Sequence, residues 1–305
     1  MLVSLGSALR SQGKFKEAAQ LFRRALAIRE AALGPDHPAV AVALSSLGFA
    51  LEQQGEYKEA LEVTRRSLTI REKALGPDHS EVGQALLTVG NVLDDLGDLE
   101  GAVASYQRAL AIRERVNGPE SNEVADVLNN IGQTLSVQGK LPEALVYMER
   151  ALAIREKVLG PDHPEVVTAL ANVGSILNGL HRPREALASF ERAIALGEKV
   201  LGQEHPYLGD ALDGMGVSYL ELHQPMRARA PLERALAMRE KLAAARIEIG
   251  DVSFHLARAL WDTGGDRVRA VSLARRARDY LGGEQASRNK NDLAKIDAWL
   301  AVHGG

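Results

Sequence analysis

Hydrophobic residues recur along the chain with the three- and four-residue spacing of amphipathic helices. Residues 41–54 place apolar side chains at Leu44, Leu47 and Leu51, which predicts a helix with one apolar face. A glycine interrupts this run, and residues 57–75 carry a second run of the same kind before a Gly-Pro pair ends it. The pattern therefore predicts pairs of helices joined by short turns.

The helix pair repeats with a period of 42 residues. Five copies of a connector of the type Gly-Pro-Asp-His-Pro begin at residues 34, 76, 118, 160 and 202. Two single-residue ladders keep the same phase: Gly6, Gly48, Gly90, Gly132, Gly174 and Gly216, and Ala18, Ala60, Ala102, Ala144, Ala186, Ala228 and Ala270.

The glycine ladder predicts close packing inside each pair. A glycine within a helix costs about 1 kcal/mol relative to alanine, so six in phase need a structural reason. We expect the second helix to approach there, with Gly48 facing Ala60 or its neighbours. Enlarging either residue should cost roughly 1 to 3 kcal/mol.

The period predicts an all-α fold, a right-handed α-solenoid of antiparallel helix pairs in which each pair needs its neighbours to bury its apolar face. We expect six 42-residue repeats over residues 1–242, the first shortened at its N-terminus, and a degenerate seventh over 243–282. Residues 283–305 are expected to form a capping helix and tail, with an apolar face of Leu293, Ile296, Trp299 and Leu300. The shortened first repeat suggests a fragment of a longer protein.

The order of residues from Leu47 to Ala60, Leu-Gly-x-x-Leu-x-x-x-Gly-x-x-x-x-Ala, resembles the tetratricopeptide repeat. That repeat usually has 34 residues, and the 42-residue form is similar to the repeats of kinesin light chains and of bacterial proteins with kinesin-light-chain-like repeats. Ala109 to Glu114 and Leu128 to Gly132 carry the closest match. The resemblance implies a protein-binding scaffold, the docking or sensor region of a larger bacterial regulatory protein such as a serine/threonine kinase or an NTPase.

Composition narrows the function further. The net charge is -3 and no long Lys/Arg run is present, which argues against binding to nucleic acid or to anionic membranes. No apolar stretch approaches the ~20 residues that span a bilayer. The chain has no cysteine, which excludes disulfides and thiolate metal sites. We expect a cytoplasmic protein.

Two ladders of functional side chains have structural interpretations. His37, His79, His163 and His205 occur once per repeat, too far apart to share an ion, and are expected to close the connector beside an N-capping Asp. Arg29, Arg71, Arg113, Arg155 and Arg239 each precede a Glu and are expected to form ion pairs between repeats rather than a phosphate site. Motifs of phosphate loops, metalloproteases and serine hydrolases are missing. We expect no enzyme activity, no cofactor and no metal.

The first helices of stacked repeats should line a concave groove, and their polar residues are the predicted binding site. These are Ser45, Phe49 and Glu52 in the second repeat, Leu87, Asn91 and Asp94 in the third, Asp126, Asn129 and Gln133 in the fourth, Ser175 and Asn178 in the fifth, and Asp213 and Val217 in the sixth. Amides can donate to and accept from a peptide backbone, and the apolar members can form pockets for apolar anchors. By the resemblance, Asn129 would grip bound peptide. The alternative is an ordinary solvated helix face.

The charge of the groove residues predicts the charge of the partner. The groove positions are mostly acidic, amide or apolar, with Arg10 the one basic residue. We therefore expect a basic or mixed apolar segment to bind better than an acidic one. A structural array that stacks end to end through Leu2, Leu5 and Leu9 is the alternative function.

Overall fold

The structure is a computed structural model that describes residues 2–282 and 290–304, and all regular structure within them is helical. It contains α1 (Leu2–Ser11), α2 (Phe15–Leu33), α3 (Pro38–Glu52), α4 (Tyr57–Leu75), α5 (Ser80–Leu96), α6 (Leu99–Asn117), α7 (Asn122–Val137), α8 (Leu141–Leu159), α9 (Pro164–Gly179), α10 (Pro183–Val200), α11 (Tyr207–Glu221), α12 (Pro225–Lys241), α13 (Arg246–Asp262), α14 (Arg267–Leu281) and α15 (Lys290–His303). The predicted all-α class is confirmed.

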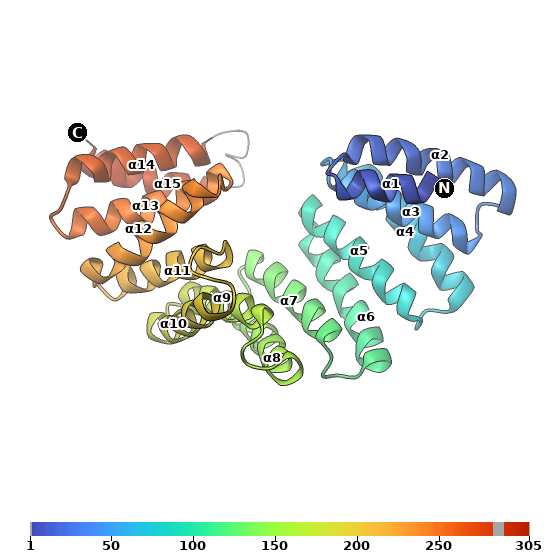
Figure 1. Cartoon of the computed structure of the whole chain (residues 1–305), viewed down its shortest axis with the longest axis horizontal. Coiled ribbons are helices and arrows are strands. Elements are labelled where there is room, and N and C mark those ends of the chain that lie inside the picture. The colour runs from blue at the N-terminus through green and yellow to red at the C-terminus, as the bar shows by residue number, and fades with distance from the viewer. Residues whose placement is uncertain (1, 283–289, 305) are drawn as a thin grey trace. The chain divides into compact units, whose positions relative to one another are not determined.

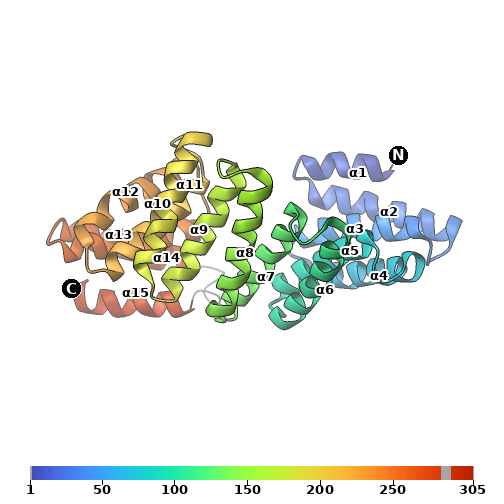
Figure 2. The same ribbon diagram turned by 90° about the horizontal axis from the view of Figure 1, so that it is seen from below.

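The chain divides into two compact units, Met1–Ile154 and Arg155–Gly305. Within each unit, consecutive helices pair in antiparallel fashion, as α3 does with α4 and α13 with α14 (Figures 1 and 2). The second helix of each pair also packs on the first helix of the next, as α4 does on α5 and α12 on α13. Each unit is therefore a stack of helix pairs.

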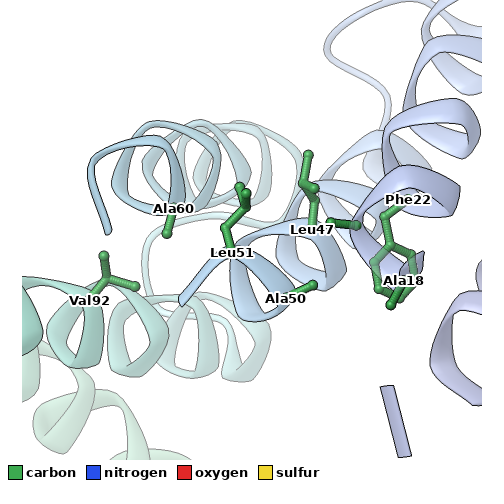
Figure 3. Packing of buried hydrophobic residues seen from close by; sticks show 8 residues of the cluster. Ala18, Phe22, Leu47, Ala50, Leu51, Ala60 and Val92 are labelled. Carbon is green, nitrogen blue, oxygen red and sulfur yellow. The ribbon is translucent and has the colours of Figure 1, made fainter. Parts of the chain in front are cut away.

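The alanine ladder lies in the core of both units. Its seven members are fully buried, and in the N-terminal unit Ala18 and Ala60 join a cluster with Phe22 and Leu51 that extends from α2 to α5 (Figure 3). Small side chains here let consecutive helices approach closely enough for the large residues between them to interlock.

The glycine ladder makes room for a larger side chain. A Cβ at Gly48 would lie 2.4 Å from Thr64, and one at Gly90 would lie 2.4 Å from the ring of Tyr106. The prediction that Gly48 faces a neighbour of Ala60 is confirmed, and the residue that it faces lies one turn beyond the alanine.

The connectors differ from expectation in which residue caps the helix. Nδ1 of His37 accepts a hydrogen bond from the backbone N–H of Ala39 at 3.1 Å, and His163 caps α9 in the same way. The prediction of an Asp N-cap is wrong, because Asp36 turns outward and pairs with Lys73 at 3.5 Å. The imidazole acceptor reaches the N–H two residues on and takes the place of the usual carboxylate.

Ion pairs join successive second helices at a fixed separation of 36 residues. A Glu of each second helix accepts from an Arg of the next second helix, in the pairs Glu30–Arg66, Glu72–Arg108, Glu114–Arg150, Glu156–Arg192, Glu198–Arg234 and Glu240–Arg276. Five of these glutamates directly follow a ladder Arg, and Glu198 follows Gly197.

The preceding arginines reach the first helix of the next repeat instead. Arg71 pairs with Glu81 at 3.3 Å, which confirms the expected inter-repeat ion pair at that position. Arg29 differs, because it donates to the carbonyl of Ala39 at 2.5 Å. The ladder arginines therefore join repeats by binding either a carboxylate oxygen or a backbone carbonyl oxygen of the next repeat.

The C-terminal helix packs through aromatic rings. Trp299 of α15 meets Phe254 and Trp261 of α13 edge-on, with ring centroids 6.2 and 5.5 Å apart. Ile296 is buried beside them, so the predicted apolar face of this helix points inward. Residues 283–289 of the predicted cap lie outside the described residues.

Candidate functional site

Three depressions lie along the first helices, two in the N-terminal unit and one in the C-terminal unit. The first contains Ser45 and Phe49, the second Glu52, Asn91, Asp94 and Gln133, and the third Ser175, Asn178, Asp213 and Val217. Within each unit, the structure thus brings together predicted residues from neighbouring repeats. Leu87, Asp126 and Asn129 line none of these three depressions.

The first depression, about 280 Å³, is mixed apolar and polar. Phe49 is 36 % exposed, and the guanidinium of Arg10 lies 5.0 Å above its ring. Arg71 enters from α4 and donates to Oγ of Ser45 at 2.9 Å. Its polar atoms are thus largely occupied, and the Phe49 ring is the surface that remains for an apolar partner.

The second depression, about 230 Å³, is acidic. Glu52, Asp94 and Asp95 line it together with amides and Tyr106, and its lining contains no basic side chain. The hydroxyl of Tyr106 donates to Oδ1 of Asn91 at 2.9 Å, and Thr134 donates to Oδ1 of Asp94 at 2.8 Å. These bonds fix the walls of the depression.

Glu52 carries the unbalanced charge of this depression. Burial and the neighbouring charge of Asp95 raise the pKa of Glu52 to about 7. Burial and the charges of Asp94, Asp95 and Glu52 likewise raise the pKa of Tyr106. Among the described residues, Glu52 has no hydrogen-bond or ion-pair partner. A cation placed here would relieve the repulsion between the carboxylates.

The third depression, about 310 Å³, is also lined by acidic residues, but they are neutralised within the protein. Arg239 enters from α12 and donates to Oδ1 of Asp210 at 2.7 Å and to the carbonyl of Glu248 at 2.6 Å. Oδ1 of Asp213 lies 2.8 Å from Nδ1 of His255. Burial lowers the pKa of His255, yet Asp213 outweighs it and holds that pKa above its usual value.

Asn178 serves the fold of the C-terminal unit. Its Nδ2 donates to the carbonyl of Gly214 at 2.9 Å, and its Oδ1 accepts from Oγ of Ser218 at 2.7 Å. The side chain is buried. Although it lines the depression, its amide already joins α9 to α11.

Sequence reasoning missed the residues that enter from the second helices. Arg71 and Arg239 belong to the arginine ladder, and Tyr106 stands at the position of Phe22, 84 residues earlier. The sequence signal is a hydroxyl at a position that is apolar in most of the other repeats. The expectation that only first helices face the groove gives this signal no role.

The described residues contain neither a cluster of metal-ligating side chains nor a membrane-spanning helix. No group of three or more His, Asp or Glu side chains within them is placed to hold a metal ion. None of the described helices combines the length and the apolar character needed to cross a membrane.

The family comparison identifies the repeat. The family described as Tetratricopeptide repeat matches residues 1–73, 47–115, 123–199 and 170–241. Among curated proteins, none matches this sequence.

Several solved structures share the fold. A kinesin light chain from Podosopora anserina with nearly identical TPR-like repeats is 21% identical, with a TM-score of 0.60 over 68% of this chain and 98% of that one. BtubC (BKLC) from P. vanneervenii is 22% identical, with a TM-score of 0.61 over 77% and 91%. The apo form of RapI is 15% identical, with a TM-score of 0.70 over 92% and 96%.

At these identities the structures show likeness of fold alone, whereas the family match covers well over half of the chain. Together with the stacked helix pairs and the ladders of glycine and alanine, that match establishes that the chain belongs to the tetratricopeptide-repeat family.

Proposed function

We propose that the chain is a protein-interaction scaffold that binds an extended polypeptide segment along its first helices, and that this segment is basic or mixed apolar. Tetratricopeptide repeats generally bind proteins or peptides. The observation that carries the finer proposal is the acidic depression around Glu52, which has no basic side chain in its lining.

The chemistry of this depression fits a Lys or Arg side chain. Glu52 and Asp94 would attract the cation, and a cation would restore Glu52 toward its ordinary pKa. The exposed amides of Asn91 and Gln133 stand beside them, and an amide can bond to peptide backbone of any sequence. Charge would then select the partner while the amides hold its backbone.

The adjacent depression supplies an apolar anchor point. Phe49 presents its ring beside Arg10 in the same unit. A segment with an aromatic or aliphatic residue near its cation would use both depressions of the N-terminal unit. Ring contacts of this kind contribute strongly to peptide affinity.

A display selection tests the proposal. Random peptides are selected against the full chain and against the double variant Glu52→Gln/Gln133→Ala. The matched control is Glu62→Gln/Gln107→Ala, which makes the same chemical changes at exposed positions of α4 and α6. We expect Lys- or Arg-containing peptides to be enriched and to lose at least tenfold in affinity on the double variant alone.

Enrichment of acidic peptides would refute the charge assignment. Equal binding to the double variant and to the control would refute the site. Circular dichroism and unfolding curves confirm that each variant folds, so that a loss of binding is not a loss of structure.

Self-assembly is the second candidate function, and it has a specific observation in its favour. Leu5 on α1 is 53 % exposed. Arg24 has no ion pair among the described residues, although Arg66, 42 residues later, pairs with Glu30. Leu5 and Arg24 lie on the two helices of the first pair, α1 and α2, and such exposed apolar and charged residues can receive another copy. Association that rises with concentration and disappears in Leu5→Glu supports this function, whereas a monomer at all concentrations refutes it.

The remaining expectations are part of the same proposal. A scaffold role needs no catalytic centre, cofactor or metal in this chain, and we propose that it acts in the cytoplasm as a docking region of a larger regulatory protein. The resemblance to kinesin-light-chain-like repeats supports that setting. The test compares the kinase or NTPase activity of a longer protein that contains residues 1–305 with the activity of the same protein after these residues are deleted.

A further inference from the structure

A further cavity lies on α14, near the C-terminal end of the described residues. It measures about 760 Å³ and is lined by Trp261, eight residues of α14 and the end of the chain at His303 and Gly304. The lining residues of α14 recur every three or four positions: Arg267, Val268, Val271, Ser272, Arg275, Arg276, Asp279 and Tyr280. They therefore form one face of the helix. This face is separate from the first-helix depressions.

Equivalent positions of other second helices show which contacts this face makes in the stack. Glu233 of α12 lies 42 residues before Arg275 and accepts two hydrogen bonds from Arg269 of α14, both at 2.6 Å. Arg23 of α2 lies six repeats before Arg275 and donates to Glu59 of α4 at 2.9 and 2.8 Å. At two positions of this ladder, Arg23 and Glu233, the side chain thus pairs with the opposite charge on the next second helix.

Arg275 has the charge of Arg23 without its partner. Arg275 donates to the carbonyl of Gly304 at 2.8 Å, and Arg267 lies 4.9 Å above the ring of Trp261. Neither guanidinium has a carboxylate partner within the described residues. Arg276, by contrast, is neutralised by Glu240.

Apolar groups lie between the two unpaired arginines. Val268 is 83 % exposed, and Val271 follows one turn later. Arg267 and Arg275 are eight residues apart, which places them ~12 Å apart along the helix axis. An apolar strip with a cation at each end matches an amphipathic helix that carries carboxylates two turns apart.

We propose that this face of α14 binds an acidic amphipathic helix of a partner protein, which is joined to α14 by charged pairs of the kind that link successive second helices. A Glu of the partner pairs with Arg275 in the geometry of Glu59 on Arg23, and its apolar face covers Val268 and Val271. The site goes beyond the proposed function, because its partner has the opposite charge from the partner of the Glu52 depression.

The lining also orients the partner. Asp279 lies one turn beyond Arg275 and repels a carboxylate there. Gly282 occupies the repeat position of Glu240, so the ladder offers no acid for an Arg of the incoming helix. The acidic residues of the partner therefore lie between the positions of Arg267 and Arg275 and not beyond Arg275.

The test uses a library of displayed helical peptides with a fixed Leu stripe and either Glu or Lys at each flanking position. It is selected against the full chain, and individual peptides are then measured on Arg275→Glu and Val268→Asp. Arg184→Glu and Val146→Asp are the matched controls, since both positions are exposed on other second helices. We expect Glu-rich helices to be enriched and to lose at least tenfold in affinity on each α14 variant but not on the controls.

The charge exchange gives the sharpest outcome. Arg275→Glu should turn the selection toward Lys-rich helices. Enrichment of Lys-rich helices on the unchanged protein, absence of any enrichment, or equal binding to variants and controls would each overturn the proposal. A concentration-dependent dimer that Arg275→Glu abolishes would make the occupant a second copy and would overturn it as well.

The two sites can fail independently. Glu52→Gln/Gln133→Ala should leave binding of the acidic helix unchanged, and Arg275→Glu should leave binding of basic peptides unchanged. Loss of both kinds of binding in either variant would show that the readouts do not separate the sites, and it would contradict the assignment of the acidic helix to α14.

Discussion

Glu52 in the N-terminal unit and Asn178 in the C-terminal unit occupy the same repeat position, three periods apart, yet they serve different ends. Glu52 is a half-buried carboxylate with a pKa of about 7 and with no partner among the described residues. Asn178 is buried and bonds to both Gly214 and Ser218. One unit leaves a charge for a ligand, and the other uses the position to join its own helices.

The arginine ladder shows the same contrast. Arg71 and Arg239 share a repeat position, and each reaches the first helix of its own pair. Within its own pair, Arg71 meets only the hydroxyl of Ser45, at 2.9 Å, and its carboxylate partner Glu81 belongs to the next repeat. Arg239 meets the carboxylate of Asp210 in its own pair at 2.7 Å and lies 3.8 Å from Asp213. The fold fixes where an arginine points, and the residue opposite decides whether the depression keeps a net charge.

The largest expected effect comes from removing the charge that the C-terminal unit needs. Arg239→Met removes a buried guanidinium that pairs with the exposed Asp210 and lies 3.8 Å from the largely buried Asp213, which should cost about 2 kcal/mol or more. Arg71→Met removes bonds that are mostly to neutral oxygens and should cost about 1 kcal/mol. Urea unfolding of both variants measures the difference, and equal losses would contradict the contrast between the units.

The glycine ladder gives the next effect. Gly90→Ala would force the ring of Tyr106 to move, and Gly174→Ala would do the same to Phe190. Each should cost roughly 1 to 3 kcal/mol. Only Gly90→Ala should weaken basic peptides, because Tyr106 bonds to Asn91 in the acidic depression. Unfolding curves and peptide titrations of the two variants separate stability from binding.

The features that can be predicted from the sequence are those that recur in every repeat. The period revealed the helices, the buried alanines and the ion-pair positions, because each recurs and each depends on contacts that recur. The hydrogen bonding of the groove position, absent at Glu52 and present at Asn178, differs from repeat to repeat. It depends on Ser218 and Asp95, side chains of a neighbouring repeat that approach only in the folded stack. The Asp N-cap prediction failed for a similar local reason, since an imidazole was able to accept the same bond.

A smaller effect comes from the titration of Glu52. Its pKa is raised from 4.5 to about 7, so folding disfavours the ionised form. The native state is favoured most below pH 4.5, and this advantage is lost as the pH rises through about 7. Glu52→Gln should therefore be more stable than the unchanged protein at pH 8 and no more stable at pH 4.

Thermal unfolding across this range measures the change, with Glu62→Gln as the control that should show no such dependence. Basic peptides should bind the unchanged protein more tightly at pH 8 than at pH 6, because the carboxylate is then ionised. A flat pH profile in both measurements would mean that Glu52 is not the unbalanced charge.

The smallest loss of stability is expected at an ion pair that both units contain. Arg66 pairs with Glu30 in one unit, and Arg234 pairs with Glu198 at the same repeat position in the other. These pairs are partly exposed, so Arg66→Ala and Arg234→Ala should each cost about 0.5 kcal/mol and less in high salt. Unfolding in low and high salt measures both. Because the ladder repeats the same contact, the two losses should match, and a markedly larger loss in one unit would show that the difference between the units extends beyond the depressions into the stacking itself.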